Sequence, residues 1–164
     1  GSACILGKDQ TNSNREYVLG VWNGKVRIFI KSQGGNNQQS IDSTTSLSAG
    51  QWYHVVATYN GVGGNNAADG LTIYINGAAE TPTNVTKNTY VAMSNGTSPF
   101  VIGQYFNAAF VDGDIDEVAI WSKALDATDI QTIHNATNDN PGKCANLWSG
   151  GLGTGLVYWN RMGD

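Results

Sequence analysis

Short segments in which apolar and polar residues alternate run along most of the chain, and turn-forming dipeptides separate them. Residues 15–22 (REYVLGVW) and 25–30 (KVRIFI) flank Asn23-Gly24. This arrangement predicts a β-hairpin, because Asn and Gly tolerate the positive φ angles of a two-residue turn. The same pattern predicts further strands over 51–59, 71–75, 98–104 and 113–121, a second hairpin turn at Asn76-Gly77, and a polar, glycine-rich loop over 61–70.

One helix is predicted after the last of these strands. Asp126 is a suitable N-cap, and Asp129 lies three residues later, near the positive end of the helix dipole. Leu125 and Ile130 have the spacing of a hydrophobic staple. The helical region is expected to end within 138–142. Many strands, regular turns and one short late helix indicate an all-β fold, an antiparallel β-sandwich.

The 164 residues suit one domain, which we place over 1–145, with 146–164 as a glycine-rich hinge and a tail strand. The formal net charge is −4, and the nine lysines and arginines are scattered singly. Nucleic-acid and anionic-membrane surfaces need a basic patch, so the charge pattern argues against both. No apolar run approaches the roughly 20 residues of a membrane span. The low charge and abundant Asn, Ser, Thr and Gly are common on secreted β-proteins and on structural proteins of virus particles.

Four sequence blocks carry a family likeness. They are LSAGQWYHVVATYNG, DGLTIYING, PFVIGQ and GDIDEVAIWSKALDATDIQTIH, in that order between Leu47 and His134. Together they resemble a laminin-G-like module of the concanavalin A-like lectin/glucanase superfamily, and pentraxins are similar in the same segments. The resemblance implies a jelly roll of two curved antiparallel sheets, usually extracellular. It also implies binding of sugar, glycosaminoglycan or protein, often with calcium.

The acidic stretch VDGDIDEVAIW (111–121) raises the question of catalysis. Retaining glucanases of the resembling superfamily carry three carboxylates on one strand face, spaced two residues apart. Here the matching face would hold Asp114, Asp116 and Val118, so the third carboxylate is missing. The only histidines are His54 and His134, and His54 is expected to be structural. We therefore expect no enzyme and interpret the acidic stretch as part of the scaffold, with glycan hydrolysis as a weak alternative.

Calcium is the second question for the acidic residues. An EF-hand loop starting at Asp112 is excluded, because its sixth position is Glu117 and its twelfth is Lys123. A calcium site of the kind found in laminin-G modules stays open, and its candidate ligands are Asp9, Asp69 and Asp112. The alternative is that these are solvated loop carboxylates.

Aromatic residues divide into two groups. Trp22, Trp52 and Trp121 fall on predicted strands, so we expect them to pack in the core. A loop between two predicted strands contains Tyr105, Phe106, Asn107 and Phe110. Exposed aromatics in a polar loop would form a ligand-binding surface, and burial beneath the loop is the alternative.

The only cysteines are Cys4 and Cys144. A disulfide between them can form if the compartment is oxidising. It would join the first strand to the tail, provided that the fold brings the two residues to bonding distance.

The tail is expected to form a strand through Leu156, Val157, Tyr158 and Trp159, which resemble the opening strand of a laminin-G-like module. This order predicts that the front of the module is missing, so we expect the chain either to be a slice of a tandem protein or to use this strand to complete a sheet beside 115–121. The strand would complete either a sheet of the same chain or a sheet of a second copy of the chain. In the second case, Gly151, Gly153 and Gly155 would form a flexible hinge.

These observations favour a non-enzymatic recognition or adhesion module that binds a glycan or glycoprotein surface, with calcium as a candidate cofactor. The location expected is extracellular or at a particle surface. A structural building block of a virus particle appendage or of an extracellular assembly is the alternative, and it would use self-association through the tail strand.

Overall fold

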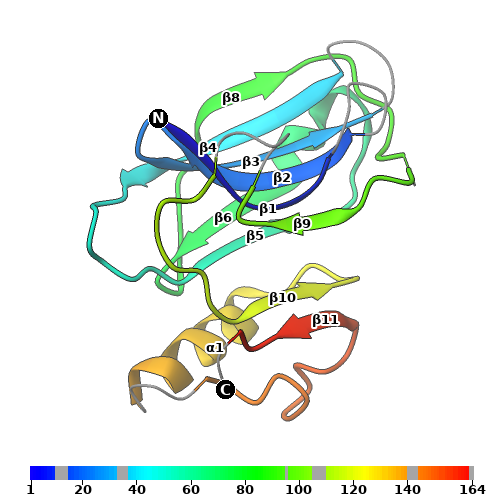
Figure 1. Cartoon of the computed structure of the whole chain (residues 1–164). Helices are drawn as coiled ribbons and strands as arrows, with labels where there is room; N and C mark the ends of the chain where they lie inside the picture. Colours follow the sequence, from blue (N-terminus) through cyan, green and yellow to red (C-terminus); the bar gives the residue numbers. More distant parts are fainter. Residues whose placement is uncertain (10–14, 33–36, 95, 105–109, 140–143, 163–164) are drawn as a thin grey trace.

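A computed structural model describes residues 1–9, 15–32, 37–94, 96–104, 110–139 and 144–162. Its largest sheet has six strands in the order β8-β4-β3-β2-β1-β9, and all neighbours are antiparallel. Figure 1 shows this sheet as the upper layer. The strands are β1 (Ser2–Asp9), β2 (Arg15–Trp22), β3 (Lys25–Lys31), β4 (Gln38–Ser46), β8 (Thr83–Lys87) and β9 (Phe100–Ile102).

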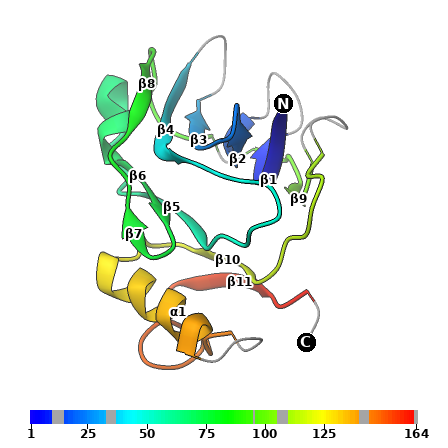
Figure 2. The ribbon, with the colours of Figure 1, turned by 90° about the vertical axis from the view of Figure 1, so that its left-hand side faces the viewer.

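The second layer is built from two smaller sheets. One is β5 (Val55–Tyr59), β6 (Leu71–Ile75) and β7 (Ala78–Ala79), and the other is β10 (Val118–Trp121) with β11 (Leu156–Asn160). A 3-10 helix, η1 (Gly64–Gly70), precedes β6, and the helix α1 (Ala127–Asp139) follows β10. Figures 1 and 2 both place α1, β10 and β11 at the bottom of the molecule, below β5. The antiparallel β-sandwich, a jelly roll, is confirmed.

The main core lies between the six-stranded sheet and the β5-β6-β7 sheet. Alternate residues of β3 and β6 point into it, because successive side chains of a strand point to opposite faces. The buried members of this set are Val26, Ile28 and Ile30 on β3 with Leu71, Ile73 and Ile75 on β6. The helix α1 covers the other face of β6 through Tyr74 and Ile130. In the described part of the chain, neither helix is long and apolar enough to cross a membrane.

Local signals predicted the turns and the helix start correctly. Asn23 and Gly24 have φ angles of 51° and 77°, and Asn76 and Gly77 have 51° and 78°, so both turns use positive φ as expected. The Asp126 Oδ1 atom accepts the Asp129 backbone N–H at 2.8 Å, which is the predicted N-cap. Leu125 and Ile130 are buried in the same cluster, as a hydrophobic staple requires.

The predicted strand over 51–59 starts later than expected, and Trp52 does not pack in the core. Strand β6 ends at Ile75, opposite Val55, and the Asn76-Gly77 turn then leads the chain away. The pairing ends with hydrogen bonds between His54 and Asn76 of the turn, and Trp52, two residues earlier, is 68% exposed. Trp22 and Trp121 are partly buried against apolar clusters, as predicted.

Two further predictions of local structure were wrong. Residues 61–70 contain η1, in which Ala67 and Ala68 are buried, where a polar loop was predicted. The Ala68 backbone N–H donates to the buried Gln39 Oε1 atom at 3.1 Å, which ties η1 to β4. The predicted strand over 113–121 is a strand only from Val118, because Glu117 has a φ of 53° that is incompatible with an extended strand.

The tail forms a strand, and the prediction that Leu156, Val157, Tyr158 and Trp159 are ordered in a sheet is confirmed. Strand β11 pairs antiparallel with β10 of the same chain, beside the acidic stretch as predicted. The Tyr158 ring also contacts the Phe100 ring of β9, with centroids 5.3 Å apart. Self-association through β11 stays a prediction, and in the described part of the chain β10 is its only neighbour within a sheet.

The glycine-rich segment before β11 packs against the rest of the tail, and the flexible hinge that strand exchange would need stays a prediction. Leu152 is buried among Ala145 and Leu147. The Leu152 carbonyl accepts the Trp121 Nε1–H group at 2.7 Å. The positive φ angles of Gly150, Gly151 and Gly155 serve tight turns around this buried leucine.

The disulfide that the sequence left open between Cys4 and Cys144 is not formed in this structure, where both residues carry thiols. Cys4 is buried in a cluster with Val18 and Phe29 on the outer face of the six-stranded sheet. Cys144 instead lines a pocket beside Trp159 of β11, so the two residues belong to different parts of the fold.

Candidate functional site

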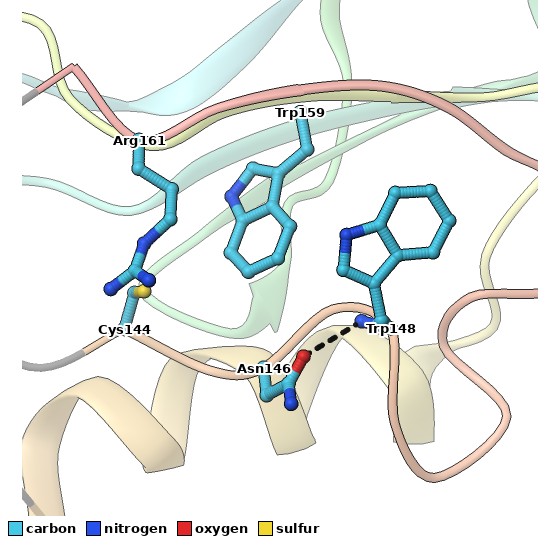
Figure 3. A pocket seen from close by; sticks show the side chains of 5 residues that line it. All are labelled: Cys144, Asn146, Trp148, Trp159 and Arg161. Carbon is cyan, nitrogen blue, oxygen red and sulfur yellow. Dashed lines mark hydrogen bonds between the residues drawn. The ribbon is translucent and has the colours of Figure 1, made fainter. Parts of the chain in front are cut away.

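A pocket of about 480 Å³ lies between the segment 144–148 and the end of β11. Figure 3 shows the side chains that line it, which are Cys144, Asn146, Trp148, Trp159 and Arg161. We call this the C-terminal pocket. Its walls come from two segments that the buried Leu152 and its neighbours hold together.

The segment 144–148 presents alternate residues to the pocket. Ala145 and Leu147 are buried and fix the segment against the tail cluster. Asn146 and Trp148 lie on the opposite side, and Trp148 is 67% exposed. The Asn146 Oδ1 atom accepts the Trp148 backbone N–H at 3.1 Å, which fixes the turn between them. The Trp148 indole is therefore held at the pocket by its backbone while its ring stays accessible.

Strand β11 supplies the other wall through Trp159 and the following Arg161. The Trp159 Nε1–H group donates to Glu117 Oε2 at 2.7 Å. The Arg161 guanidinium lies 5.5 Å from the centroid of the Trp159 indole, a cation–π contact. A second Glu117 oxygen lies 3.6 Å from Arg161 Nε. Glu117 therefore fixes both the indole and the guanidinium from the start of β10.

The lining combines aromatic surface with hydrogen-bond donors and one positive charge. None of the five lining residues is a carboxylic acid or a histidine. The described part of the pocket therefore lacks a pair of groups for general acid–base chemistry. Its two indoles can stack on a ring, and its polar groups can orient that ring.

A family model identifies most of the chain, up to the segment that lines the pocket. The model described as "Concanavalin A-like lectin/glucanases superfamily" matches residues 1–131. The chain belongs to the concanavalin A-like lectin/glucanases superfamily. The laminin-G-like resemblance of the sequence is thereby confirmed. The superfamily's description covers both binding proteins and enzymes, and the C-terminal pocket lies beyond the matched residues.

A solved structure similar to this superfamily member is that of an S-layer domain-containing protein (residues 221–444) from Clostridium thermocellum, with 23% identity and a TM-score of 0.35. The match covers 82% of this chain and 63% of that chain. Among curated proteins, none matches this chain.

The predicted aromatic site is placed only in part. Tyr105, Phe106 and Asn107 lie outside the residues that the structure describes. Phe110, from the same predicted loop, is 58% exposed, so it does not pack in the core. Its role in ligand binding stays a prediction.

The structure describes the side chains of two of the three predicted metal ligands, Asp69 and Asp112. Asp69 forms an ion pair with Lys87, with its Oδ1 atom 2.6 Å from Nζ. Asp112 lies exposed in the loop before β10, and the side chain of Asp9 is outside the described residues. No group of three His, Cys, Asp or Glu side chains suited to a metal occurs in the described part of the chain. Calcium binding stays a prediction, which a rise in melting temperature at millimolar Ca²⁺ would support.

Within the acidic stretch, Glu117 makes the contact that matters for the structure, and its neighbours Asp114 and Asp116 do not. Asp114 and Asp116 are exposed on an irregular segment, so they do not share a strand face as the pattern suggested. Glu117 instead binds Trp159, a residue 42 positions away. Sequence reasoning missed the C-terminal pocket because this contact forms only when the tail folds back onto β10.

Glu117→Ala is expected to lower the free energy of unfolding by about 2 kcal/mol, because the Trp159 Nε1–H group loses a charged acceptor. Glu117 already has a φ of 53°, so alanine adds no new backbone strain. Urea unfolding followed by tryptophan fluorescence measures the change. The control is Asp114→Ala, which removes an exposed side chain and should change stability by less than about 0.5 kcal/mol. Equal effects of the two substitutions would contradict the role assigned to Glu117.

Proposed function

We propose that this superfamily member is an extracellular, non-enzymatic recognition module that binds carbohydrate in its C-terminal pocket. The observation that carries the proposal is the pairing of two indoles, Trp148 and Trp159, with the polar groups of Asn146 and Arg161. The extracellular location is inferred from the laminin-G-like family, whose members are usually extracellular.

The chemistry of the lining suits a sugar ring. A pyranose has an apolar face of C–H groups that can stack on an indole, while its oxygen atoms accept hydrogen bonds at the ring edge. A volume of about 480 Å³ falls in the range of ordinary small-molecule sites. Because the ring of Trp148 is exposed, a sugar can reach it directly from the solvent.

The same residues argue against hydrolysis of that sugar. A glycosidase needs two carboxyl groups, about 5 Å apart when retaining and roughly 6.5–9.5 Å apart when inverting. The described lining offers none. Asp114 and Asp116 are exposed outside the pocket, so they would not flank a bond held there.

A glycan array tests the proposal with two matched variants. Trp148→Ala should lower the affinity for the bound glycan by about tenfold or more, because it removes a stacking surface. Trp52→Ala is the control, since Trp52 is exposed to nearly the same degree, 68% against 67%, and does not line the pocket. Binding that is absent in the wild type, or lost equally in both variants, would overturn the proposal.

The two cysteines provide an independent readout. Cys144 lines the pocket and is partly exposed, whereas Cys4 is fully buried. A bound glycan should therefore slow the alkylation of Cys144 by iodoacetamide. Cys4 should not react in the folded protein with or without the glycan, so its modification would report unfolding.

A further inference from the structure

We propose that His54 and His134 form an acid-sensitive latch that holds α1 against the sandwich and thereby keeps the C-terminal pocket assembled. In mild acid the latch opens more often, and a ligand in the pocket is then released faster. The part of this inference that concerns the ligand rests on the proposed function, whereas the latch itself is a property of the fold.

The two histidines meet where α1 packs on the end of the sandwich. His134 belongs to α1, and His54 is the residue that precedes β5. Their ring centroids lie 5.6 Å apart, with the ring planes tilted by 32°. Gly77, in the turn after β6, lies so close to His134 that a Cβ atom at this glycine would be 3.1 Å from Nδ1. The helix therefore sits directly on His54 and on the Gly77 turn.

The backbone of His54 is fixed at this contact. Its N–H group donates to Asn76 Oδ1 at 3.0 Å, and its carbonyl accepts the Asn76 backbone N–H at 2.8 Å. The Nδ1 atom of its ring is buried and has no hydrogen-bond partner among the described residues. An imidazolium at this position would lose hydration without gaining an acceptor, so the closed latch favours the neutral ring. Burial accordingly lowers the pKa of His54, and the charge of His134 lowers it further.

The described elements around His54 bring it no compensating carboxylate. The charge that acts on it is that of His134, and the turn between β6 and β7 is uncharged. At the start of α1, Asp126 caps the helix, and Asp129 lies 3.6 Å from Lys123 Nζ. Protonation of His54 therefore favours a state in which α1 has moved away and the ring meets water.

Helix α1 connects this contact to the C-terminal pocket. Ile133, the residue before His134, packs against the cluster that joins α1 to β6 and also against the tail cluster around Leu152. Trp159, which lines the pocket, packs against the same tail cluster. Figures 1 and 2 show α1 beside β10 and β11, below β5. Movement of α1 removes one support of the pocket wall, so the pocket loses its shape before the six-stranded sheet unfolds.

Hydrogen–deuterium exchange at pH 7.5 and pH 5, corrected for the intrinsic exchange rate at each pH, tests the latch without any ligand. Because the opening is local, α1 and β11 should exchange faster than the central strand β3 at both pH values. From pH 7.5 to pH 5 the protection of α1 and β11 should fall by about 30-fold, because the open state binds a proton at His54 that the closed state does not.

Two variants separate His54 from other titrating groups. In His54→Gln the fall for α1 should shrink to less than about threefold, because glutamine does not titrate. Asp129→Asn is the control. It removes a carboxylate from the first turn of α1 and keeps the backbone N–H that Asp126 caps, so it should retain the wild-type fall. Each variant is compared with itself at the two pH values, so a change in its overall stability cancels.

The wild-type data alone can overturn the latch. Equal protection of α1 and β3 would show that α1 opens only together with the whole sandwich. Unchanged protection of α1 at pH 5 would show that its opening does not expose His54. A fall in α1 with β11 unchanged would overturn the link to the pocket, and with it the proposal.

The ligand is tested separately, with the glycan that binds most strongly on the array. It should dissociate faster at pH 5 than at pH 7.5, by up to about 30-fold, and His54→Gln should remove most of the difference. Equal dissociation rates of the wild type at the two pH values would overturn regulation of the site. If the array shows no bound glycan, the proposed function fails, and the exchange data still decide whether the latch exists.

Discussion

Asp42→Asn is expected to lower the free energy of unfolding by about 3 kcal/mol, because it breaks a buried ion pair and leaves its cationic partner uncompensated. The Asp42 side chain is only 3% exposed. Its carboxylate accepts hydrogen bonds from Arg27 Nε and, at 2.7 Å, from Arg27 Nη2. Asn84 Nδ2 donates a further bond at 2.9 Å. An asparagine at this position has one acceptor oxygen in place of two and no charge.

The matched control is Asp69→Asn, the same substitution in an exposed ion pair. The Asp69 side chain is 60% exposed and pairs with Lys87. Exposed ion pairs contribute about 0–1 kcal/mol, so this variant should unfold at nearly the wild-type urea concentration. Similar losses in the two variants, from urea curves of equal slope, would refute the importance of burial at Asp42.

The effect of acid on Asp42 has a defined direction. Burial alone would raise the pKa of the Asp42 carboxyl group, but the hydrogen bonds from Arg27 and Asn84 and the charge of Arg27 hold that pKa below the ordinary 3.8. The lowered pKa stabilises the folded chain above pH 3.8, and this contribution is lost as the pH falls through the folded-state value. The Asp42–Arg27 ion pair should therefore contribute the same stability from pH 7.5 to pH 5, the range in which we expect His54 to act.

Acidification from pH 7.5 to pH 5 is expected to reduce stability by about 2 kcal/mol through His54 alone. Burial lowers the pKa of His54 from 6.5 to about 4, and the charge of His134 adds to the shift. The two rings lie 5.6 Å apart between centroids, where α1 meets the residue that precedes β5. The buried Nδ1 atom of His54 has no hydrogen-bond partner among the described residues, so the folded state gives an imidazolium little support.

The sign follows from which state binds the proton more tightly. Between pH 6.5 and about 4 the unfolded chain protonates His54 and the folded chain does not. The stabilisation is therefore complete above pH 6.5, decreases as the pH falls toward 4, and amounts to about 3 kcal/mol over the whole window. Urea unfolding at several pH values, together with an NMR titration of the His54 ring, measures both the loss and its cause.

Two histidine variants serve as controls. His54→Gln should remove this part of the pH dependence, whereas His134→Gln should retain most of it, because burial is the larger cause of the shift. If the wild-type chain and His54→Gln lose the same stability between pH 7.5 and pH 5, His54 is not the group responsible.

Local chemistry was sufficient to predict several elements of this chain. The Asn23-Gly24 and Asn76-Gly77 turns depend on residues that tolerate positive φ, and the start of α1 depends on Asp126 and its near neighbours. The alternation of β3 was readable for the same reason, since every second residue faces one core. The order of the four sequence blocks between Leu47 and His134 indicated the superfamily to which the chain belongs.

Tertiary contacts decided the rest. Strand β4 (QQSIDSTTS) has too few apolar residues to be recognised from its sequence. Its residues Gln39, Ser40 and Asp42 are polar and yet buried, and their burial depends on partners from β3, β8 and η1. Trp52 and Trp148 are both exposed, but only Trp148 lines the C-terminal pocket. No local feature of the sequence distinguishes the two tryptophans. The C-terminal pocket forms only where β11 pairs with β10 and packs on the Leu152 cluster, and Glu117 there holds Trp159 across 42 residues. Sequence by itself determined turns, caps and alternation, which act within a few residues. Burial of polar strands and the assembly of the pocket required the packed fold, because free energies of burial depend on neighbours that are distant in the chain.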